Sequence, residues 1–296
     1  MSNHGEATWS RPAVEEWPRR GEGNDRMRPR ARRVTIDILP DSACRYPDYD
    51  AIVCIDVLLA GTTLVTAVSQ GRRVFAARSV EEAIALGGPL SDPLLAHDLG
   101  SRRVATLGTR VGPTALARFV PAGRPLVLVS PFVELLANAS GPRSTYVASF
   151  RNLSATVAAL EGHERVALIG MGSDAEVRFE DQIAAASMAR KLLDRGFEVE
   201  GLATRSQVDR WAGADLSLLS WGKSAEELRT SGHHEDLDLV LGAVDDLPIV
   251  CRYDRGEVRG ERRRTAEPRV REDARGRGAV PVDPITLGPY ASDRIS

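Results

Sequence analysis

Cysteine is rare in this 296-residue sequence, which holds only Cys44, Cys54 and Cys251. The three residues are widely spaced and include no C-x-x-C pair, which excludes a disulfide framework and a cysteine zinc site. The sequence also lacks an apolar run near the roughly 20 residues of a membrane helix, and no apolar leader accompanies its Arg-rich N-terminus. We therefore expect a cytoplasmic protein with no membrane partner.

A large excess of charge of either sign is absent too. The net charge is −2, so the chain as a whole gives no electrostatic reason to expect a nucleic-acid partner. Residues 1–33 contain eight Arg but almost no aliphatic side chains, and residues 259–296 are similarly rich in Arg, Glu, Gly and Pro. Such segments bury too little apolar surface to offset the entropy of ordering, so we expect a disordered tail at each end and a folded domain over 34–258.

Short apolar runs alternate with helix-type patterns through the middle of the chain. The runs predicted to be strands are 34–39, 51–55, 73–77, 125–129, 144–148, 165–169 and 248–251. Helices are predicted near 62–70, 79–83, 133–138, 153–160 and 179–195. This order predicts an α/β fold, a layered α/β/α arrangement with mainly parallel sheets, and the length permits one unit or two similar lobes.

Asp56 follows the most strongly apolar of these runs, 51–55, and precedes the helix that begins near Thr62 and Thr63. A carboxylate at the carboxyl end of a buried strand is costly to desolvate unless it binds something, so Asp56 is a candidate metal ligand. The alternative is a carboxylate that caps nearby backbone. The two Thr hydroxyls are equally compatible with phosphate binding and with capping the helix.

Further polar residues follow other predicted strands. The segment 89–113 predicts a long functional loop, in which Asp98 is a candidate catalytic residue as a general acid or metal ligand. Asn152 is expected to contact substrate or to cap the next helix. Gly170 begins a G-x-G turn that either lets a ligand approach the backbone or only marks the turn.

The assembled motifs resemble the magnesium-dependent 2-phosphosulfolactate phosphatases. The family's D-V-x-R-A-T-T is similar to the stretch from Asp56 to Thr63, and its G-S-F-x-N to the stretch from Ala148 to Asn152. Its S-x-E-E-A is similar to 79–83, its E-D helix start to Glu180 and Asp181, and its ending to 231–248. The resemblance covers about residues 34–258 in the family's order.

This resemblance implies a hydrolase of phosphate monoesters that uses Mg²⁺ and acts on a small phosphorylated metabolite, with no nucleic acid involved and a homo-oligomer compatible with the sequence. It implies the metal ligands Asp56, Glu180 and Asp181, although the helix macrodipole alone would explain the last two carboxylates. The residues expected to be catalytic are Asp56, Asp98 and Asn152. Those expected to bind substrate are Thr62, Thr63, Arg102 and Gly170.

The chain departs from the family pattern in its arginines. The Arg of D-V-x-R corresponds to Leu58 or Leu59 here. The family also has the motif L-x-G-E-R-x-G, and the corresponding stretch of this chain lacks the Arg unless Arg102 takes its place. Arginine binds phosphate through paired charge-assisted hydrogen bonds that leucine does not offer. The alternative to an active phosphatase is therefore a degenerate relative that binds a ligand or partner without turnover. The two differ in whether an Arg from 101–110 enters the site beside Asp56.

Overall fold

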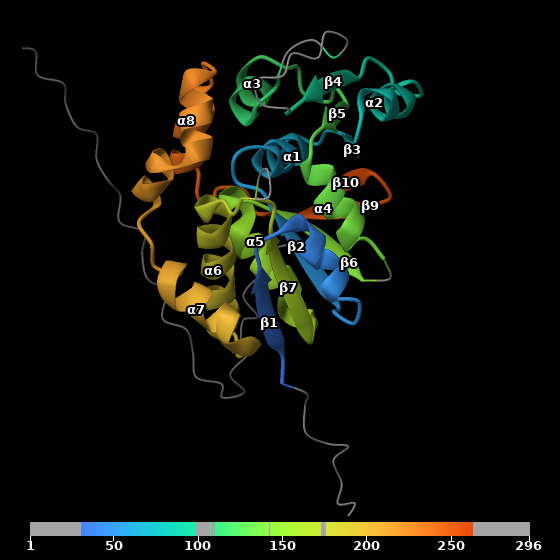
Figure 1. Cartoon of the computed structure of the whole chain (residues 1–296). Helices are drawn as coiled ribbons and strands as arrows, with labels where there is room; N and C mark the ends of the chain where they lie inside the picture. The colour runs from blue at the N-terminus through green and yellow to red at the C-terminus, as the bar shows by residue number, and fades with distance from the viewer. Residues whose placement is uncertain (1–30, 99–106, 108–109, 142, 173–175, 263–296) are drawn as a thin grey trace, which may run out of the picture. The chain divides into compact units, whose positions relative to one another are not determined.

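One mixed sheet contains all the strands found in the computed structural model, which describes residues 31–98, 107, 110–141, 143–172 and 176–262 (Figure 1). In chain order the strands are β1 Arg33–Asp37, β2 Ala51–Ile55, β3 Val74–Ala77, β4 Leu94–His97, β5 Leu126–Val129, β6 Ser144–Ala148, β7 Arg165–Gly170, β8 Glu198–Val199, β9 Ile249–Asp254 and β10 Glu257–Arg262. Their order across the sheet is β4-β5-β3-β10-β9-β6-β2-β7-β1-β8.

The helices lie mostly between successive strands. They are α1 Ala60–Ser69, α2 Val80–Gly87, α3 Pro113–Arg118, α4 Phe132–Ala139, α5 Leu153–Ala159, α6 Phe179–Leu193, α7 Gly201–Trp211, α8 Lys223–Thr230 and α9 His234–Gly242. Short 3-10 turns span Pro40–Arg45, Phe150–Asn152, Leu160–Gly162 and Leu216–Trp221. The expected layered α/β fold with a mainly parallel sheet is confirmed. None of the helices in the described ranges is long and apolar enough to cross a membrane.

The hairpin β9–β10 divides the sheet into two parallel sets. Strands β4, β5 and β3 pair in parallel, as do β6, β2, β7, β1 and β8. The contacts β3–β10, β10–β9 and β9–β6 are all antiparallel, so the two sets run in opposite directions. The strands of the first set therefore end at the opposite edge of the sheet from the strands of the second set.

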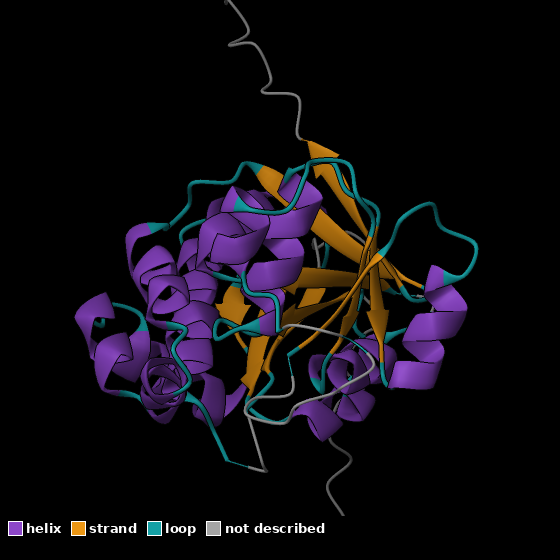
Figure 2. Ribbon diagram, turned by 90° about the horizontal axis from the view of Figure 1, so that it is seen from above, coloured by secondary structure: helices purple, strands orange, loops and turns teal. Residues whose placement is uncertain are grey.

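Strand β2 lies inside the second set, between β6 and β7, and all five of its side chains are fully buried. Ala51, Val53 and Ile55 belong to the core beneath α5 to α9, while Ile52 and Cys54 belong to the core beneath α1, α3 and α4. Figure 2 shows helices on both sides of the sheet. The continuous apolar run of β2 follows from this burial on both faces.

Two sequence expectations need correction. The segment 89–113, interpreted as a loop, contains strand β4 and the first residue of α3, because Leu94 to His97 pair with β5. The chain also continues past the boundary expected at 258, since β10 runs to Arg262 between β9 and β3. Its alternating sequence around buried Val258 was obscured by the many charged residues of that segment. The rest of the expected tails, 1–30 and 263–296, lies outside the described residues.

Candidate active site

Asp56 follows β2 directly, and its side chain is buried at the start of the loop that leads into α1. The backbone amide of Gly61, in the first turn of α1, donates a hydrogen bond to the Asp56 carboxylate. Gly61 packs so tightly here that a Cβ atom would lie 2.2 Å from the carbonyl oxygen of Asp56. Only glycine therefore lets α1 begin this close to the end of β2.

Asp181 connects this loop to two other elements. It lies in the first turn of α6, and its Oδ1 accepts a hydrogen bond of 2.9 Å from the backbone amide of Val57. Its Oδ2 accepts a hydrogen bond of 3.1 Å from the amide of Gly172, which has a positive φ of 61°. Asp181 thus fixes the α6 N-terminus to the segments that follow β2 and β7.

A second carboxylate of α6, Glu180, is also buried, with 2% of the residue exposed. The Ser224 hydroxyl of α8 donates a hydrogen bond to it. Gly222, the N-cap of α8, packs against the α6 N-terminus, where an added Cβ would lie 2.7 Å from the Phe179 ring. The N-termini of α6 and α8 therefore enclose Glu180 together.

Asp98 joins the site from the other parallel set, directly after β4. Its Oδ1 accepts a hydrogen bond of 3.3 Å from Nη2 of Arg110, whose Nη1 donates to the Ser231 hydroxyl at 3.3 Å. Burial raises the pKa of Asp98 to about 6, with the positive charge of Arg110 acting in the opposite direction and Asp236 adding to the rise. Asp98 is thus an acid whose proton is exchangeable near neutral pH.

Four carboxylates interact electrostatically in this region. The pKa of Asp56 is raised well above its usual range by burial, and further by the charges of Asp181, Asp98 and Glu180. Burial and the charge of Glu180 raise the pKa of Asp181 to about 8, and burial also raises the pKa of Glu180. The cluster therefore favours binding of protons or a cation.

The threonines expected to bind substrate are buried with their hydroxyls directed at the backbone. Thr62 Oγ1 donates to the carbonyl of Val57 at 2.7 Å, and Thr63 Oγ1 donates to the carbonyl of Leu59 at 2.9 Å. Both residues are 1% exposed. In this structure the two hydroxyls stabilise the loop between Asp56 and α1, but neither caps the helix, because the N-cap residue of α1 is Leu59, whose side chain makes no capping hydrogen bond.

Asn152 is held by backbone groups as well. Its Oδ1 accepts from the amide of Ser149 at 3.0 Å, and its Nδ2 donates to the carbonyls of Val147 and Ile249 at 3.1 and 3.4 Å. The residue is fully buried and forms a capping box with Ser149. The capping box belongs to the 3-10 turn Phe150–Asn152, and Asn152 makes no side-chain cap hydrogen bond to α5.

Gly170 ends β7 beside Asp181, where an added Cβ would lie 3.1 Å from the Asp181 Cβ. Arg102 lies outside the described residues. Sequence reasoning did not select Arg178, which precedes α6 and lies beside Glu180 and Asp181. An isolated Arg before a helix is normally solvated. Only the packing of α8 against the start of α6 identifies Arg178 as a buried residue of the site.

The donor chemistry of the site suits Mg²⁺, which takes oxygen ligands and keeps several water molecules while using only one or two carboxylates. Asp56, Glu180 and Asp181 offer such oxygens. Within the described ranges, however, no group of three or more His, Cys, Asp or Glu side chains is assembled closely enough to hold a metal ion. Each Asp181 oxygen already accepts one backbone hydrogen bond and keeps one further lone pair.

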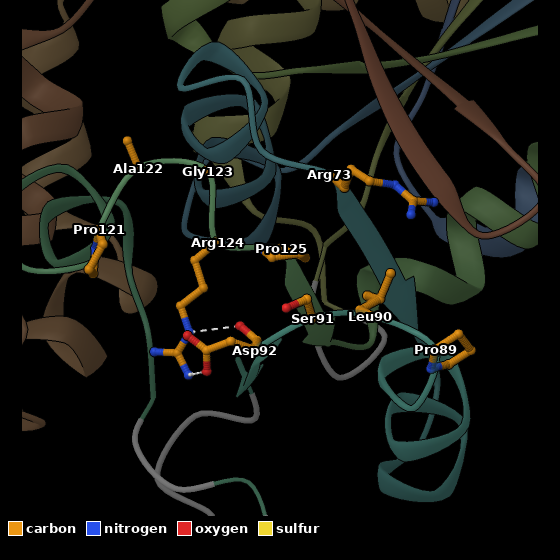
Figure 3. Close-up of a pocket in the computed structure, with 10 residues that line it drawn as sticks. All are labelled: Arg73, Pro89, Leu90, Ser91, Asp92, Pro121, Ala122, Gly123, Arg124 and Pro125. Atoms are coloured by element: carbon orange, nitrogen blue, oxygen red, sulfur yellow. Dashed lines mark hydrogen bonds and ion pairs between the residues drawn. The ribbon is translucent and has the colours of Figure 1, made fainter.

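A hollow of about 530 Å³ lies elsewhere, at the amino-terminal ends of β3, β4 and β5 (Figure 3). It is lined by Arg73, Pro89, Leu90, Ser91, Asp92, Pro121, Ala122, Gly123, Arg124 and Pro125. Its charged side chains are already paired, because Arg124 Nη2 lies 3.0 Å from Asp92 Oδ1 and Arg73 Nε lies 3.3 Å from Oε1 of Glu257. Asp98 follows the opposite end of β4, so this hollow is separate from the carboxylate cluster.

Comparison with known proteins identifies the family of the chain. The model of the 2-phosphosulpholactate phosphatase family matches residues 38–256, which include all four carboxylates of the cluster. The chain belongs to this family. A probable 2-phosphosulfolactate phosphatase of Deinococcus radiodurans is 31% identical over 221 residues, covering 73% of this chain and 87% of the relative. Proteins of the same description from Parasynechococcus marenigrum and Pseudothermotoga lettingae are each 26% identical, covering 68% and 62% of this chain and 88% and 81% of their own.

The sequence-based resemblance to this family is thereby confirmed, and with it the assignment to the phosphoric monoester hydrolases. The family match spans β2, the loop through Asp56, α1 and the start of α6. These are the elements that carry the carboxylate cluster.

Proposed function

We propose that this chain hydrolyses the phosphate monoester of a small acidic metabolite in a reaction that requires Mg²⁺, with 2-phosphosulfolactate as the leading candidate substrate. Water would attack the phosphorus atom and displace the substrate oxygen, which takes up a proton, giving sulfolactate and inorganic phosphate. The observation that carries this proposal is the buried cluster of Asp56, Asp98, Glu180 and Asp181, in which burial and then like charges raise the pKa of Asp56. Such a cluster is costly to the fold unless a bound cation offsets the repulsion.

The residues of this cluster would have different roles. One or two of the carboxylates Asp56, Glu180 and Asp181 would hold Mg²⁺ together with water molecules, and Asp181 would in addition keep the Asp56 loop in place through the Val57 amide. When bound, the ion would neutralise charge that develops on the phosphoryl oxygens. Gly61 would keep the Asp56 carboxylate oriented through its backbone amide.

Asp98 suits the role of general acid. Hydrolysis leaves an alkoxide oxygen that needs a proton, and an acid with a pKa of about 6 both retains and donates protons near neutral pH. The hydrogen bond from Arg110 orients the Asp98 carboxyl group and places a guanidinium beside it. The proton would pass from the Asp98 carboxyl group to the leaving oxygen of the hydroxy acid.

Arg110 also bears on the alternative of a degenerate binder. That alternative depends on the absence of an arginine in the site, whereas Arg110 contacts Asp98, and Asp98 in turn acts on Asp56. Arg110 therefore supports the active enzyme through its contact with the proposed general acid, while its Nη1 and Nη2 are already engaged by Ser231 and Asp98.

The test is phosphate release by the full chain from 2-phosphosulfolactate and from a panel of phosphorylated hydroxy acids, sugars and nucleotides, with and without Mg²⁺. We expect release from 2-phosphosulfolactate that requires Mg²⁺ and is lost in Asp56→Asn. Release without added metal in the presence of a chelator would contradict the Mg²⁺ requirement. No release from any substrate by a folded protein would favour the degenerate binder.

A further inference from the structure

Arg178 is a buried guanidinium that has no hydrogen-bond acceptor among the residues that the structure describes. Its side chain is 6% exposed, and Nε, Nη1 and Nη2 all lack a hydrogen-bond partner within the described part of the chain. The one ion pair that it forms there is with Glu227, at 3.6 Å between Nη2 and Oε1, and Glu227 itself is largely exposed. Burying five N–H donors without acceptors is unfavourable, so acceptors from outside the chain would offset a real cost.

A second buried arginine shows how this chain satisfies a structural guanidinium. Arg72 is 5% exposed, the same as Arg178 as a whole residue. It donates to Gln70 Oε1 at 2.6 Å and to the carbonyls of Pro121, Arg124 and Val120 at 2.7, 3.0 and 2.8 Å. Arg72 thus ties a loop to the end of α1, a role for which Arg178 lacks the contacts.

The position of Arg178 places its free donors at the carboxylate cluster. Arg178 is the residue before α6, a helix of 15 residues, and its positive charge acts on both Glu180 and Asp181. The N-terminus of a helix of this length favours anions through its macrodipole and its free amides. Arg110, by contrast, already uses Nη1 and Nη2 for Ser231 and Asp98.

We propose that Arg178 is a substrate-binding residue that takes an oxyanion group of the substrate through paired hydrogen bonds. A phosphate, a sulfonate and a carboxylate all present two oxygens to a planar guanidinium, and 2-phosphosulfolactate carries all three groups. The inference deepens the proposed function and rests on it for the identity of the substrate. It adds a specificity residue directly before α6.

The experiment compares Arg178→Lys with the wild type by calorimetric binding of inorganic phosphate and of sulfolactate, each in the presence of Mg²⁺. Lysine keeps the charge but not the fork of parallel donors, so we expect affinity for at least one of the two anions to fall about tenfold or more. The midpoint of thermal unfolding should change little, because no protein hydrogen bond is lost. Arg72→Lys is the matched control, with a lower unfolding midpoint and unchanged anion affinity.

The pattern of loss identifies the group that Arg178 binds. Weaker binding of phosphate alone assigns Arg178 to the phosphoryl group, and weaker binding of sulfolactate alone assigns it to the acid groups. Unchanged affinity for both anions, or absence of anion binding by the wild type, would overturn the inference. Binding that depends on Arg178 in a protein that releases no phosphate would instead refute the proposed function and leave the anion site standing.

Discussion

Replacing Asp56 by Asn should make the metal-free protein more stable at alkaline pH. The pKa of Asp181 is about 8 in the folded state and 3.8 for the free side chain, a difference of about 4 units. At about 1.36 kcal/mol per unit, ionising this buried group alone lowers the free energy of unfolding by at most about 6 kcal/mol. This is large beside a total stability of about 5–15 kcal/mol. Asp56 takes part in the same repulsion, since the charge of Asp181, after burial, raises the pKa of Asp56.

The sign follows from proton binding. The folded state keeps the Asp181 proton up to about pH 8, whereas the unfolded chain releases it near pH 3.8, so stability falls as pH rises between these values. The Asp56 carboxyl group behaves in the same direction, because its pKa is also raised. The effect of Asp56→Asn should therefore be largest at about pH 8 and smallest at about pH 4, near the pKa of 3.8 at which the unfolded chain also takes up the proton.

The assay is thermal and urea unfolding of both proteins at these two pH values, with a chelator or with Mg²⁺. We expect Asp56→Asn to be more stable by about 1–2 kcal/mol at about pH 8 without metal, or by about 2–8 °C in the unfolding midpoint. Mg²⁺ should stabilise the wild type more than the variant, because binding to the folded state alone adds stability. Asp238→Asn, at an exposed position of α9, is the matched control. A variant less stable than the wild type at about pH 8 would refute the reasoning.

Three further predictions concern other parts of the site. Asp98→Asn should lower phosphate release at about pH 6, because the amide is no general acid. The descending limb of the pH–rate profile with an apparent pKa near 6 should disappear as well. A profile identical in shape to that of the wild type would exclude Asp98 as the acid. Asn152→Ala should cost about 2–4 kcal/mol of unfolding free energy in urea titration, since three buried hydrogen bonds are lost; lost activity at unchanged stability would instead favour substrate contact. Gly61→Ala should lower the unfolding midpoint and reduce the rise in this midpoint that Mg²⁺ produces, because the added Cβ would displace the Asp56 backbone. The control Gly213→Ala, at an exposed position, should leave the effect of Mg²⁺ on the midpoint intact.

Local sequence patterns were enough to identify the central part of the fold. The run Ala51 to Ile55 is apolar because β2 is buried on both faces, and a polar residue directly after such a run is visible without any tertiary information. The start of α6 at Phe179 and its paired carboxylates are equally local features. Strand, turn and helix patterns of this kind depend on neighbouring residues in the chain, which the sequence displays directly.

Contacts between segments far apart in the chain determined the rest of the fold and of the site. Asp98 reaches the cluster from a strand set that runs opposite to β2, and the central hairpin that reverses the direction includes residues up to Arg262. The buried state of Arg178 depends on the packing of α8 against α6, more than 40 positions along the chain. Sequence alone therefore determined which carboxylates follow which elements, whereas the tertiary structure decided which charges share one buried site, because burial and electrostatic coupling depend on contacts between distant segments.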